Sequence, residues 1–376
     1  MKIGILTLPQ ETNYGGILQA YALQHTLRKM GHDAITIDRH NRKEYPSWWI
    51  HLAGYCKRIV QRYLLGKNVT TKWNPFVSPE EYAVLSSEIQ GFIDRNIQLT
   101  KRVFSDELAE IEKEYQFDAY VVGSDQVWQD FYCPASFLDF VQRSNVKRVT
   151  YAASCNRSSF LNNPAKIKVC GDLAKLFSGI SVREDYLVPL CKDKLGIDVQ
   201  WVLDPTMLLS PNEYLEASEN RVGEEPVFFT YILDVDDDKT GAIHYLSSKL
   251  GLPIVSGNRI NESQNGRSTY PSVDNWIHNL NRSRYVVTDS FHGTVFSILF
   301  NKPFISIGNS KRGMARFQSL LGRFGLEDRL VQDYLDADNL LEKIVRPIDF
   351  SLVNSIIQKE RSKSLDFLIK ALDNNG

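Results

Sequence analysis

Residues 285–293 read YVVTDSFHG, and they decide the fold class. The aromatic and β-branched residues 285–288 are typical of a buried parallel strand. The turn that contains His292 follows directly, and residues 294–300 then predict a helix. In open α/β sheets, ligands bind at the carboxyl ends of the strands. The stretch therefore predicts an α/β fold that places a histidine at a ligand-binding edge.

Residues 179–184, GISVRE, form a second segment of this kind. A short apolar strand ends here in Arg183, whose permanently charged guanidinium fork suits a carboxylate or a phosphate. An arginine and a histidine at two strand ends predict an anionic substrate and a proton transfer.

Length and composition limit the class of protein. The 376 residues exceed one ordinary domain, and two domains of about 150 to 200 residues are expected. With 43% hydrophobic and 24% charged residues, the composition is that of an ordinary globular protein. The net charge of −1 gives no reason to expect nucleic acid as a partner.

Cysteines and apolar runs indicate the compartment. The five cysteines are odd in number and form no CxxC pair, so neither a disulfide framework nor a zinc site is predicted. The N-terminal apolar run is too short for a signal peptide, and no stretch reaches the ~18 apolar residues of a membrane span. We therefore expect a cytoplasmic protein.

Strands alternate with helices along the chain, beginning with a βαβ unit of a strand over 2–8, a helix over 17–30 and a strand over 34–38. Further strands are predicted over 119–123, 148–153, 179–182, 200–203, 227–233, 253–256, 285–288 and 303–307. This alternation predicts two Rossmann-like, doubly wound domains that face a cleft. We expect them over residues 1–215 and 216–349, with a C-terminal helix within 350–376 that returns to pack on the first domain.

Residues 41–105 break this alternation and are predicted to be an insertion in the first domain. Residues 41–75 carry seven lysines or arginines against one acid, Glu44, and three of the tryptophans. Within them, residues 48–63 predict a basic amphipathic helix with tryptophans at its apolar face. Such a helix suits an anionic membrane surface or a lipid carrier. The alternative is a helix that covers the sheet or forms a dimer contact.

Two turns at strand ends carry candidate binding residues. At residues 13–16, NYGG, paired glycines let a ligand approach the backbone, although a tight turn before a helix needs glycine as well. Ser124 and Asp125 follow another strand, where Asp125 either orients a sugar hydroxyl or caps the next helix. Residues 204–205, Asp-Pro, are predicted to form a turn, and the acidic run 234–238 predicts a solvated turn rather than a metal site.

Five segments in this order resemble the polysaccharide pyruvyl transferase family. They are NYGGILQAYALQ (13–24), VVGSDQVW (121–128), SVRE (181–184), VLDPT (202–206) and TDSFHGTVFSI (288–298). The likeness covers most of the chain outside residues 41–105. It implies a fold like that of GT-B glycosyltransferases, phosphoenolpyruvate as the donor substrate, a pair of sugar hydroxyls as the acceptor, and no metal or other cofactor.

The resemblance also assigns residues. Arg183 matches the family arginine associated with phosphoenolpyruvate, and His292 matches the family histidine of the second domain, so these two are the expected catalytic residues. Several members carry an arginine two residues before this histidine, where this chain has Ser290, so one cation is missing. Lys311, Arg312 and Arg316 are candidates to replace it. The expected substrate-binding residues are Asn13, Tyr14, Gly15, Gly16, Ser124, Asp125, Ser290, Phe291, Arg312 and Arg316.

The leading expectation is thus an enzyme that forms a pyruvate ketal on a bacterial surface polysaccharide, such as a capsule or exopolysaccharide. Its acceptor would be a sugar or a lipid-linked oligosaccharide, met in the cytoplasm or at the inner face of the plasma membrane. Two alternatives stay open. One is a GT-B nucleotide-sugar glycosyltransferase, and the other is a non-catalytic partner that binds anionic glycans, for which Ser290 is the sequence hint.

Overall fold

The computed structural model describes residues 1–41, 79–158, 160, 162–220, 222–258, 261–262, 268–308, 313–332 and 334–373, together with residues 55, 57, 59 and 60. Most of the helix predicted over residues 48–63 lies outside these ranges, as does Arg312.

The first domain is built on a parallel, six-stranded sheet of the described residues. Its strands stand in the order β2 (Asp33–Thr36), β1 (Lys2–Leu6), β5 (Ala119–Val122), β6 (Lys147–Ala153), β7 (Gly179–Val182) and β8 (Gln200–Trp201). Their runs of buried β-branched and aromatic residues are those expected of strands covered on both faces.

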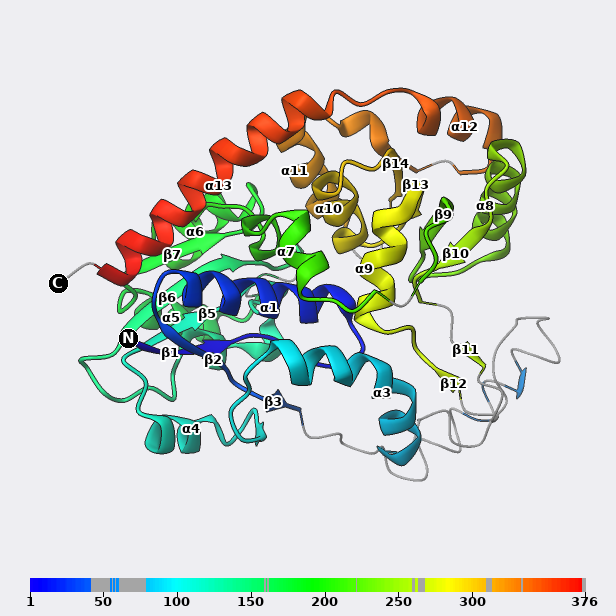
Figure 1. The fold of residues 1–376 in the computed structure, drawn as a ribbon. Coiled ribbons are helices and arrows are strands. Elements are labelled where there is room, and N and C mark those ends of the chain that lie inside the picture. Colours follow the sequence, from blue (N-terminus) through cyan, green and yellow to red (C-terminus); the bar gives the residue numbers. More distant parts are fainter. Residues whose placement is uncertain are drawn as a thin grey trace.

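Helices cover both faces of this sheet (Figure 1). One face packs on α4 (Leu108–Tyr115), α5 (Pro164–Ala174) and α6 (Leu187–Leu195). The other face packs on α1 (Tyr14–Lys29) and on the C-terminal half of α13 (Phe350–Asp373), through Leu23, Leu27, Phe367 and Leu368. The last helix, α13, therefore lies against the first sheet (Figure 1).

The second domain holds a parallel, five-stranded sheet of the described residues. The order is β10 (Ile254–Ser256), β9 (Val227–Tyr231), β13 (Ser283–Thr288), β14 (Phe304–Ile307) and β15 (Leu330–Val331). One face packs on α8 (Asp237–Leu250) and α12 (Ala337–Val345), and the other on α9 (Val273–Arg282), α10 (Phe291–Leu299) and α11 (Met314–Phe324). The predicted α/β class with doubly wound parallel sheets is confirmed.

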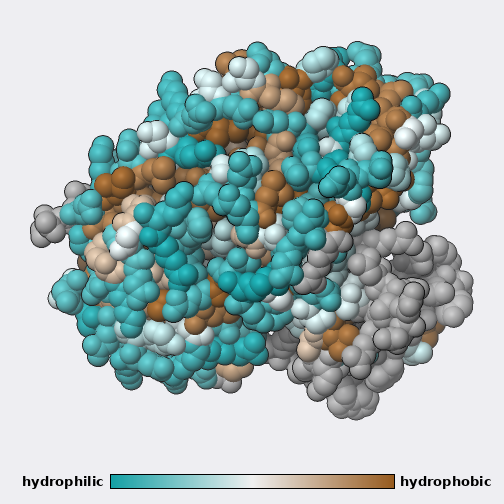
Figure 2. Space-filling model, viewed as in Figure 1, coloured by the Kyte–Doolittle hydropathy of each residue, from teal (hydrophilic) through white to brown (hydrophobic). Residues whose placement is uncertain are grey.

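Shorter elements join these layers. Two small strand pairs flank the sheets, β3 (Arg39–His40) with β4 (Val103–Phe104) and β11 (Asn261–Glu262) with β12 (Ser268–Thr269). Helices α3 (Pro79–Asn96) and α7 (Pro211–Glu216) lie between the domains, and α3 contacts α9 and β12. Apolar side chains of α3 and α7 are buried in a cluster with residues of both domains. The face of the molecule shown in Figure 2 is mostly hydrophilic, with small hydrophobic patches. No helix in the described ranges has the length and apolar character to cross a membrane.

Strand order fixes where ligands can meet each sheet. In the first sheet the order reverses between β1 and β5, and in the second between β9 and β13. A crevice opens at the carboxyl edge of a doubly wound sheet where the order reverses. Ser124 follows β5 and His292 follows β13, so both lie at these reversal points.

One local prediction is wrong. The stretch 13–16 was expected to be a turn, but Asn13 is the N-cap of α1, and Gly15 and Gly16 belong to its first turn. Glycine is a poor helix former, costing about 1 kcal/mol relative to alanine. The presence of glycine at position 15 therefore needs an explanation other than a turn, and the close contact with His292 provides it.

Candidate active site

His292 lies in the first turn of α10 and is buried, with 6% of its surface exposed. Ser290 caps this helix, since its Oγ accepts a hydrogen bond from Gly293 N at 3.4 Å. Nε2 of His292 lies 3.7 Å from Asp204 Oδ2. This is too long for a hydrogen bond but close enough for an ion pair when the ring is protonated. Within the described ranges, Nε2 has no hydrogen-bond partner.

Gly15 lies against the same imidazole. A Cβ built on Gly15 would stand 2.1 Å from His292 Nδ1, so a larger residue would displace the ring. The glycine therefore allows the start of α1, in the first domain, to approach the histidine of the second domain. The group that approaches this backbone is a side chain of the protein itself.

Arg183 directly follows β7, and three acceptors hold its guanidinium. Nε donates to Glu184 Oε1 at 2.9 Å, Nη1 to Asp204 Oδ2 at 2.9 Å, and Nη2 to Ser154 Oγ at 2.8 Å. Burial alone would lower the pKa of Arg183, but the carboxylates of Glu184 and Asp204 raise it above its usual value. A guanidinium has more N–H donors than these three contacts use.

Asp204 connects the two predicted catalytic residues. Its Oδ1 accepts from Thr206 N at 3.0 Å and from Thr206 Oγ1 at 2.7 Å, which caps the short turn Pro205–Leu208. Its Oδ2 accepts from Arg183 and from Ser124 Oγ, the latter at 3.3 Å, and faces His292. Burial raises the pKa of Asp204, but His292, Arg183 and Thr206 together lower it well below its usual value. The predicted turn is confirmed.

Phe291 brings a second cation to the cluster. The guanidinium carbon of Arg183 lies 4.3 Å from the centroid of the Phe291 ring, and that of Arg316 lies 5.8 Å from it. Arg183 belongs to the first domain, whereas Phe291 and Arg316 belong to the second. Burial lowers the pKa of Arg316, and the charge of Arg183 lowers it further. The carboxylates of Glu184 and Asp125 act in the opposite direction, so the cluster combines two arginines with acidic side chains.

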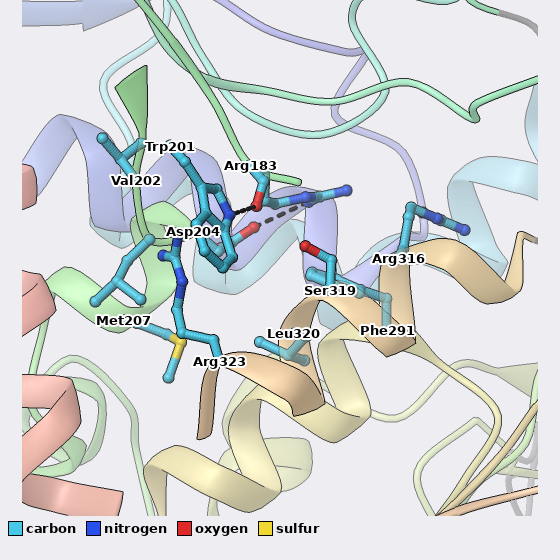
Figure 3. A pocket seen from close by; sticks show the side chains of 11 residues that line it. Arg183, Trp201, Val202, Asp204, Met207, Phe291, Arg316, Ser319, Leu320 and Arg323 are labelled. Atoms are coloured by element: carbon cyan, nitrogen blue, oxygen red, sulfur yellow. Dashed lines mark hydrogen bonds and ion pairs between the residues drawn. The ribbon is translucent and has the colours of Figure 1, made fainter. Parts of the chain in front are cut away.

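The space inside this cluster is small. Its cavity measures about 10 Å³, which holds about one water molecule. Figure 3 shows Arg323 pointing toward Trp201 while Arg316 points away from it. The Arg323 guanidinium lies 3.5 Å from the centroid of a Trp201 ring, and Trp201 Nε1 donates to the Arg183 carbonyl at 2.9 Å. An aromatic contact across the domains thus supports the backbone of Arg183.

A larger pocket of about 280 Å³ lies beside Arg316. It is bounded by the segment after β6, by Tyr186 and by the start of α11, and its lining residues are Asn156, Arg157, Ser158, Tyr186, Gly313, Met314 and Ala315. A Cβ on Gly313 would stand 3.7 Å from Arg316 Nε, which shows how near this arginine is. The pocket therefore lies between the two domains and next to the arginine cluster.

The other predicted residues fall into two groups. Ser124 and Asp125 join the cluster, because Ser124 donates to Asp204 and Asp125 Oδ1 lies 3.7 Å from Arg183 Nη2. Asp125 has φ of 70°, in the left-handed region, and accepts from Gln126 N at 2.9 Å. The helix-cap alternative for Asp125 is wrong, since a bend and a turn follow it and the next short helix, Asp130–Tyr132, has Gln129 as its N-cap.

The remaining residues of the stretch 13–16 lie apart from the arginines. Tyr14 is buried, and its hydroxyl donates to the Pro271 carbonyl at 2.7 Å. Its ring stacks on Trp276 of the second domain. Asn13 is exposed, and its side chain lies over Gly16. Tyr14 thus fastens α1 to the second domain, while Asn13 and Gly16 form the outer part of the same turn.

Sequence reasoning missed several members of the cluster. Glu184 and Asp204 lie in the segments SVRE and VLDPT, but no catalytic role was predicted for them. They follow strands β7 and β8 of the first sheet, and this brings them beside Arg183. Ser154 lies after β6 and could have been found by the same rule. Trp201 and Arg323 gave no local signal, since their contact joins β8 to α11. The described residues contain no group of three or more side chains suited to a metal ion.

Comparison with protein families agrees with this geometry. The family model described as polysaccharide pyruvyl transferase matches residues 13–311, which is most of the chain. The match runs from the first turn of α1 to the segment after β14, so it includes His292, Arg183 and Asp204. Comparison with curated proteins gave no match.

Comparison with solved structures shows the fold. A UDP-GlcNAc 2-epimerase from Neisseria meningitidis, bound to UDP-GlcNAc, has a TM-score of 0.54 at 10% identity, with 100% of both chains covered. The S. aureus MnaA structure with UDP has a TM-score of 0.50 at 10% identity, covering 99% of this chain and 97% of that one. The expected GT-B-like fold is confirmed. At these identities the likeness extends to the fold alone.

Proposed function

This chain belongs to the polysaccharide pyruvyl transferase family, and on that premise we propose that it moves the pyruvyl group of phosphoenolpyruvate onto two hydroxyls of a sugar. The products are a pyruvate ketal and inorganic phosphate. The observation that carries the proposal is the meeting of Arg183, Asp204 and His292 at the domain interface. It joins an anion-binding group to a proton-transfer group, and the donor's chemistry needs both.

His292 acts as acid and base in this proposal, because an imidazole can both donate and accept a proton near neutral pH. The imidazolium protonates C3 of phosphoenolpyruvate while one acceptor oxygen bonds to C2 and returns its proton to the ring. The second acceptor oxygen then displaces phosphate from C2, and its proton leaves with the phosphate. Two C–O bonds form, one is broken, and the histidine ends as it began.

Arginines neutralise the donor. Arg183 keeps unused N–H groups, and Arg316 lies on the other side of the interface beside the larger pocket. In this proposal Arg316 supplies the charge that several relatives carry at the position of Ser290. Ser290 itself is occupied as the cap of α10.

Substrate entry needs room that the cluster lacks. A cavity of about 10 Å³ excludes any substrate, whereas about 280 Å³ beside Arg316 suits a small anion. We place the donor at that pocket, with its reacting carbons reaching His292 after small movements of the domains. Closure around the substrates then excludes water from the reaction.

The partners follow from this reaction. A sugar or oligosaccharide acceptor is implied by the family, and in this proposal it is lipid-linked or free, with no metal or further cofactor required. Residues 48–63 would hold the enzyme at the inner face of an anionic membrane. Co-sedimentation of the protein with anionic vesicles, weakened by added salt, would support this contact. Equal co-sedimentation with neutral and anionic vesicles would contradict it.

Donor choice tests the function. Calorimetry should detect phosphoenolpyruvate binding and no binding of a panel of UDP- and GDP-sugars. The variant His292→Gln should still bind phosphoenolpyruvate, whereas its phosphate release in the presence of oligosaccharide acceptors should fall by about 10² to 10⁴, the usual effect of removing a general acid or base. Binding of a nucleotide sugar without phosphoenolpyruvate would overturn the proposal in favour of a glycosyltransferase.

A further inference from the structure

The proposed function leaves unused a pocket of about 790 Å³ in the second domain. It is formed by β10, by the end of β9 and the loop that follows it, and by the first two turns of α8. Its volume lies within the range of about 300 to 1,000 Å³ that is typical of small-molecule sites. Because it adjoins the carboxyl ends of two parallel strands, where α/β sheets bind ligands, the pocket is a candidate binding site.

The strand register brings two hydroxyl side chains together in this pocket. Thr230 of β9 pairs with Ser256 of β10, and both line the pocket. Paired residues of neighbouring parallel strands point to the same face of the sheet, about 4.8 Å apart. Thr230 is 4% exposed, and its hydroxyl makes no hydrogen bond with another residue of the described ranges. A nearly buried hydroxyl needs a partner, and the pocket is the side from which one can come.

Asn258 adds an amide in a fixed orientation. Its Nδ2 donates to the Ile232 carbonyl at 2.6 Å, and its Oδ1 accepts from Ser256 Oγ at 3.2 Å. An amide nitrogen carries two donors, and a hydroxyl accepts as well as donates, so Asn258 and Ser256 can each form a further hydrogen bond. These groups suit a ligand that is rich in hydroxyls.

The charges around the pocket disfavour an anion. Lys239 is in the lining, and its Nζ donates to Asp289 Oδ2 at 3.1 Å and lies 3.6 Å from Asp236 Oδ2. Two further acids, at residues 237–238, stand in the first turn of α8, while His244 of the lining is exposed. The described lining thus holds no lysine or arginine without a carboxylate partner, and a neutral ligand fits it better than an anion.

The rest of the lining is largely apolar. Ile232, Ile243 and Ile254 belong to it. Val235 belongs to it as well and is 71% exposed. A sugar ring presents C–H groups as well as hydroxyls, and its C–H groups gain free energy by packing on such side chains. Hydroxyls, an amide and an apolar surface in one uncharged pocket are therefore the features that a neutral sugar needs.

The pocket is connected to the turn that holds His292. Asp289, three residues before the histidine, pairs with Lys239 and also accepts from Leu233 N at 2.6 Å and from Asp234 N at 3.1 Å. The loop after β9 is thereby fixed to the start of α10. Since β10 stands two strand spacings from β13, about 10 Å, a ligand that fills the pocket and reaches His292 must cross this loop. A single sugar ring is too short for that.

We propose that this pocket binds a neutral sugar residue of an oligosaccharide acceptor, beside the sugar that receives the pyruvyl group. The inference rests on the proposed function, because it names the class of acceptor that the enzyme would use. A monosaccharide is accordingly a poor acceptor, since it cannot fill the pocket and reach His292 together.

Methyl NMR of the full-length protein tests the pocket with defined probes. Cellobiose and N,N′-diacetylchitobiose are neutral disaccharides, and cellobiouronic acid is the matched anionic probe. We expect the neutral probes to shift the methyl signals of Ile232, Ile243 and Ile254, assigned with isoleucine-to-valine variants, and the anionic probe to bind more weakly. Failure of both neutral probes to shift these signals, or equal binding of the anionic probe, would overturn the proposal. Shifts of the same signals by UDP would assign the pocket to a nucleotide instead.

Thr230→Val and Ser256→Ala each remove one hydroxyl from the pocket. Each should weaken binding of the neutral probes about 3-fold to 10-fold, the effect of losing one hydrogen bond. Ser247→Ala is the matched control on α8, because its Oγ donates to the Leu252 carbonyl at 2.7 Å and does not line the pocket. The two substitutions lie on different strands, so if one variant does not fold the other decides. Unchanged affinity in the folded variants, or an equal loss in Ser247→Ala, would refute the site.

Phosphoenolpyruvate binding separates this inference from the proposed function. Binding of phosphoenolpyruvate without binding of either neutral disaccharide would refute the sugar pocket alone. Binding of the disaccharides at these isoleucines without any binding of phosphoenolpyruvate would refute the proposed function alone.

Discussion

His292 packs so closely against Gly15 that a Cβ at position 15 would overlap the imidazole ring. The built Cβ would stand 2.1 Å from Nδ1 and 2.7 Å from the Cβ of His292. Gly15 lies in the first turn of α1 in the first domain, and His292 lies in the first turn of α10 in the second. The backbone of one domain is therefore shaped to receive the histidine of the other, and the position of the ring depends on closure.

Gly15→Ala should therefore separate stability from activity. Alanine favours a helix over glycine by about 1 kcal/mol, but its methyl group must push His292 away from Asp204. We expect turnover to fall by about 10² or more, the loss expected when an acid–base group is misplaced, with a melting temperature that changes little. Gly16→Ala is the control, because its nearest neighbour is the Asn13 side chain at 3.3 Å. Equal turnover losses in both variants would show that the contact with His292 is not the cause.

Arg183 should prove essential for stability as well as for binding. Its removal leaves the carboxylates of Glu184 and Asp204 buried without their cation. Breaking a buried ion pair on one side costs about 3–5 kcal/mol, so Arg183→Ala should lower the free energy of unfolding by that amount in urea titrations. Lys192→Ala, which breaks an exposed pair with Asp198, should cost less than about 1 kcal/mol. A similar small loss for Arg183→Ala would mean that the network is weak.

The fold class and three residues of the site could be predicted from the sequence, because both depend on the pattern of buried parallel strands. Buried parallel strands need continuous β-branched and aromatic runs, and the residue after such a run must lie at the carboxyl edge. That rule alone found Arg183, Ser124 and His292, and the resemblance then ordered them into one reaction.

The missed parts depend on contacts between domains, which leave no local pattern. The glycines at 15 and 16 look like a turn, because the close approach of His292 appears only when α10 meets α1. Asp204 was predicted to be a turn residue, and it does cap the turn Pro205–Leu208 through Oδ1. Its contacts with Arg183 and His292 through Oδ2 depend on the tertiary fold and leave no local pattern. Arg323 and Trp201 meet only across the interface.

Glu213 should make stability depend on pH. Burial raises its pKa, but Lys29 and Ser210 together lower it to about 2. A lowered pKa in the folded state means that Glu213 stabilises the fold above its unfolded pKa of about 4.5, and that this contribution is lost as the pH falls toward 2. Because Glu213 is partly exposed, we expect Glu213→Gln to cost only about 1 kcal/mol at pH 7 and a fraction of that at pH 2.5, since the contribution is lost fully only below the folded pKa. Urea titrations of the parent and of Glu213→Gln at both pH values measure this difference, and an equal cost at pH 7 and pH 2.5 would contradict it.

Arg316 should decide donor affinity in this chain. It lies against Phe291 beside the pocket of about 280 Å³, and no arginine stands at position 290 to share the charge of the donor. Hydrogen bonds to charged groups contribute about 1.5–3 kcal/mol, so Arg316→Gln should weaken phosphoenolpyruvate binding about 10-fold to 100-fold by calorimetry. Arg323→Gln is the matched control on the same helix, because that guanidinium lies against Trp201 and Arg323 does not line the pocket of about 280 Å³. It should lower the melting temperature while donor affinity changes less than about threefold, which is under 1 kcal/mol. If both variants bind the donor as the parent does, another group neutralises the phosphate, and Arg316 does not replace the arginine that several relatives carry at the position of Ser290.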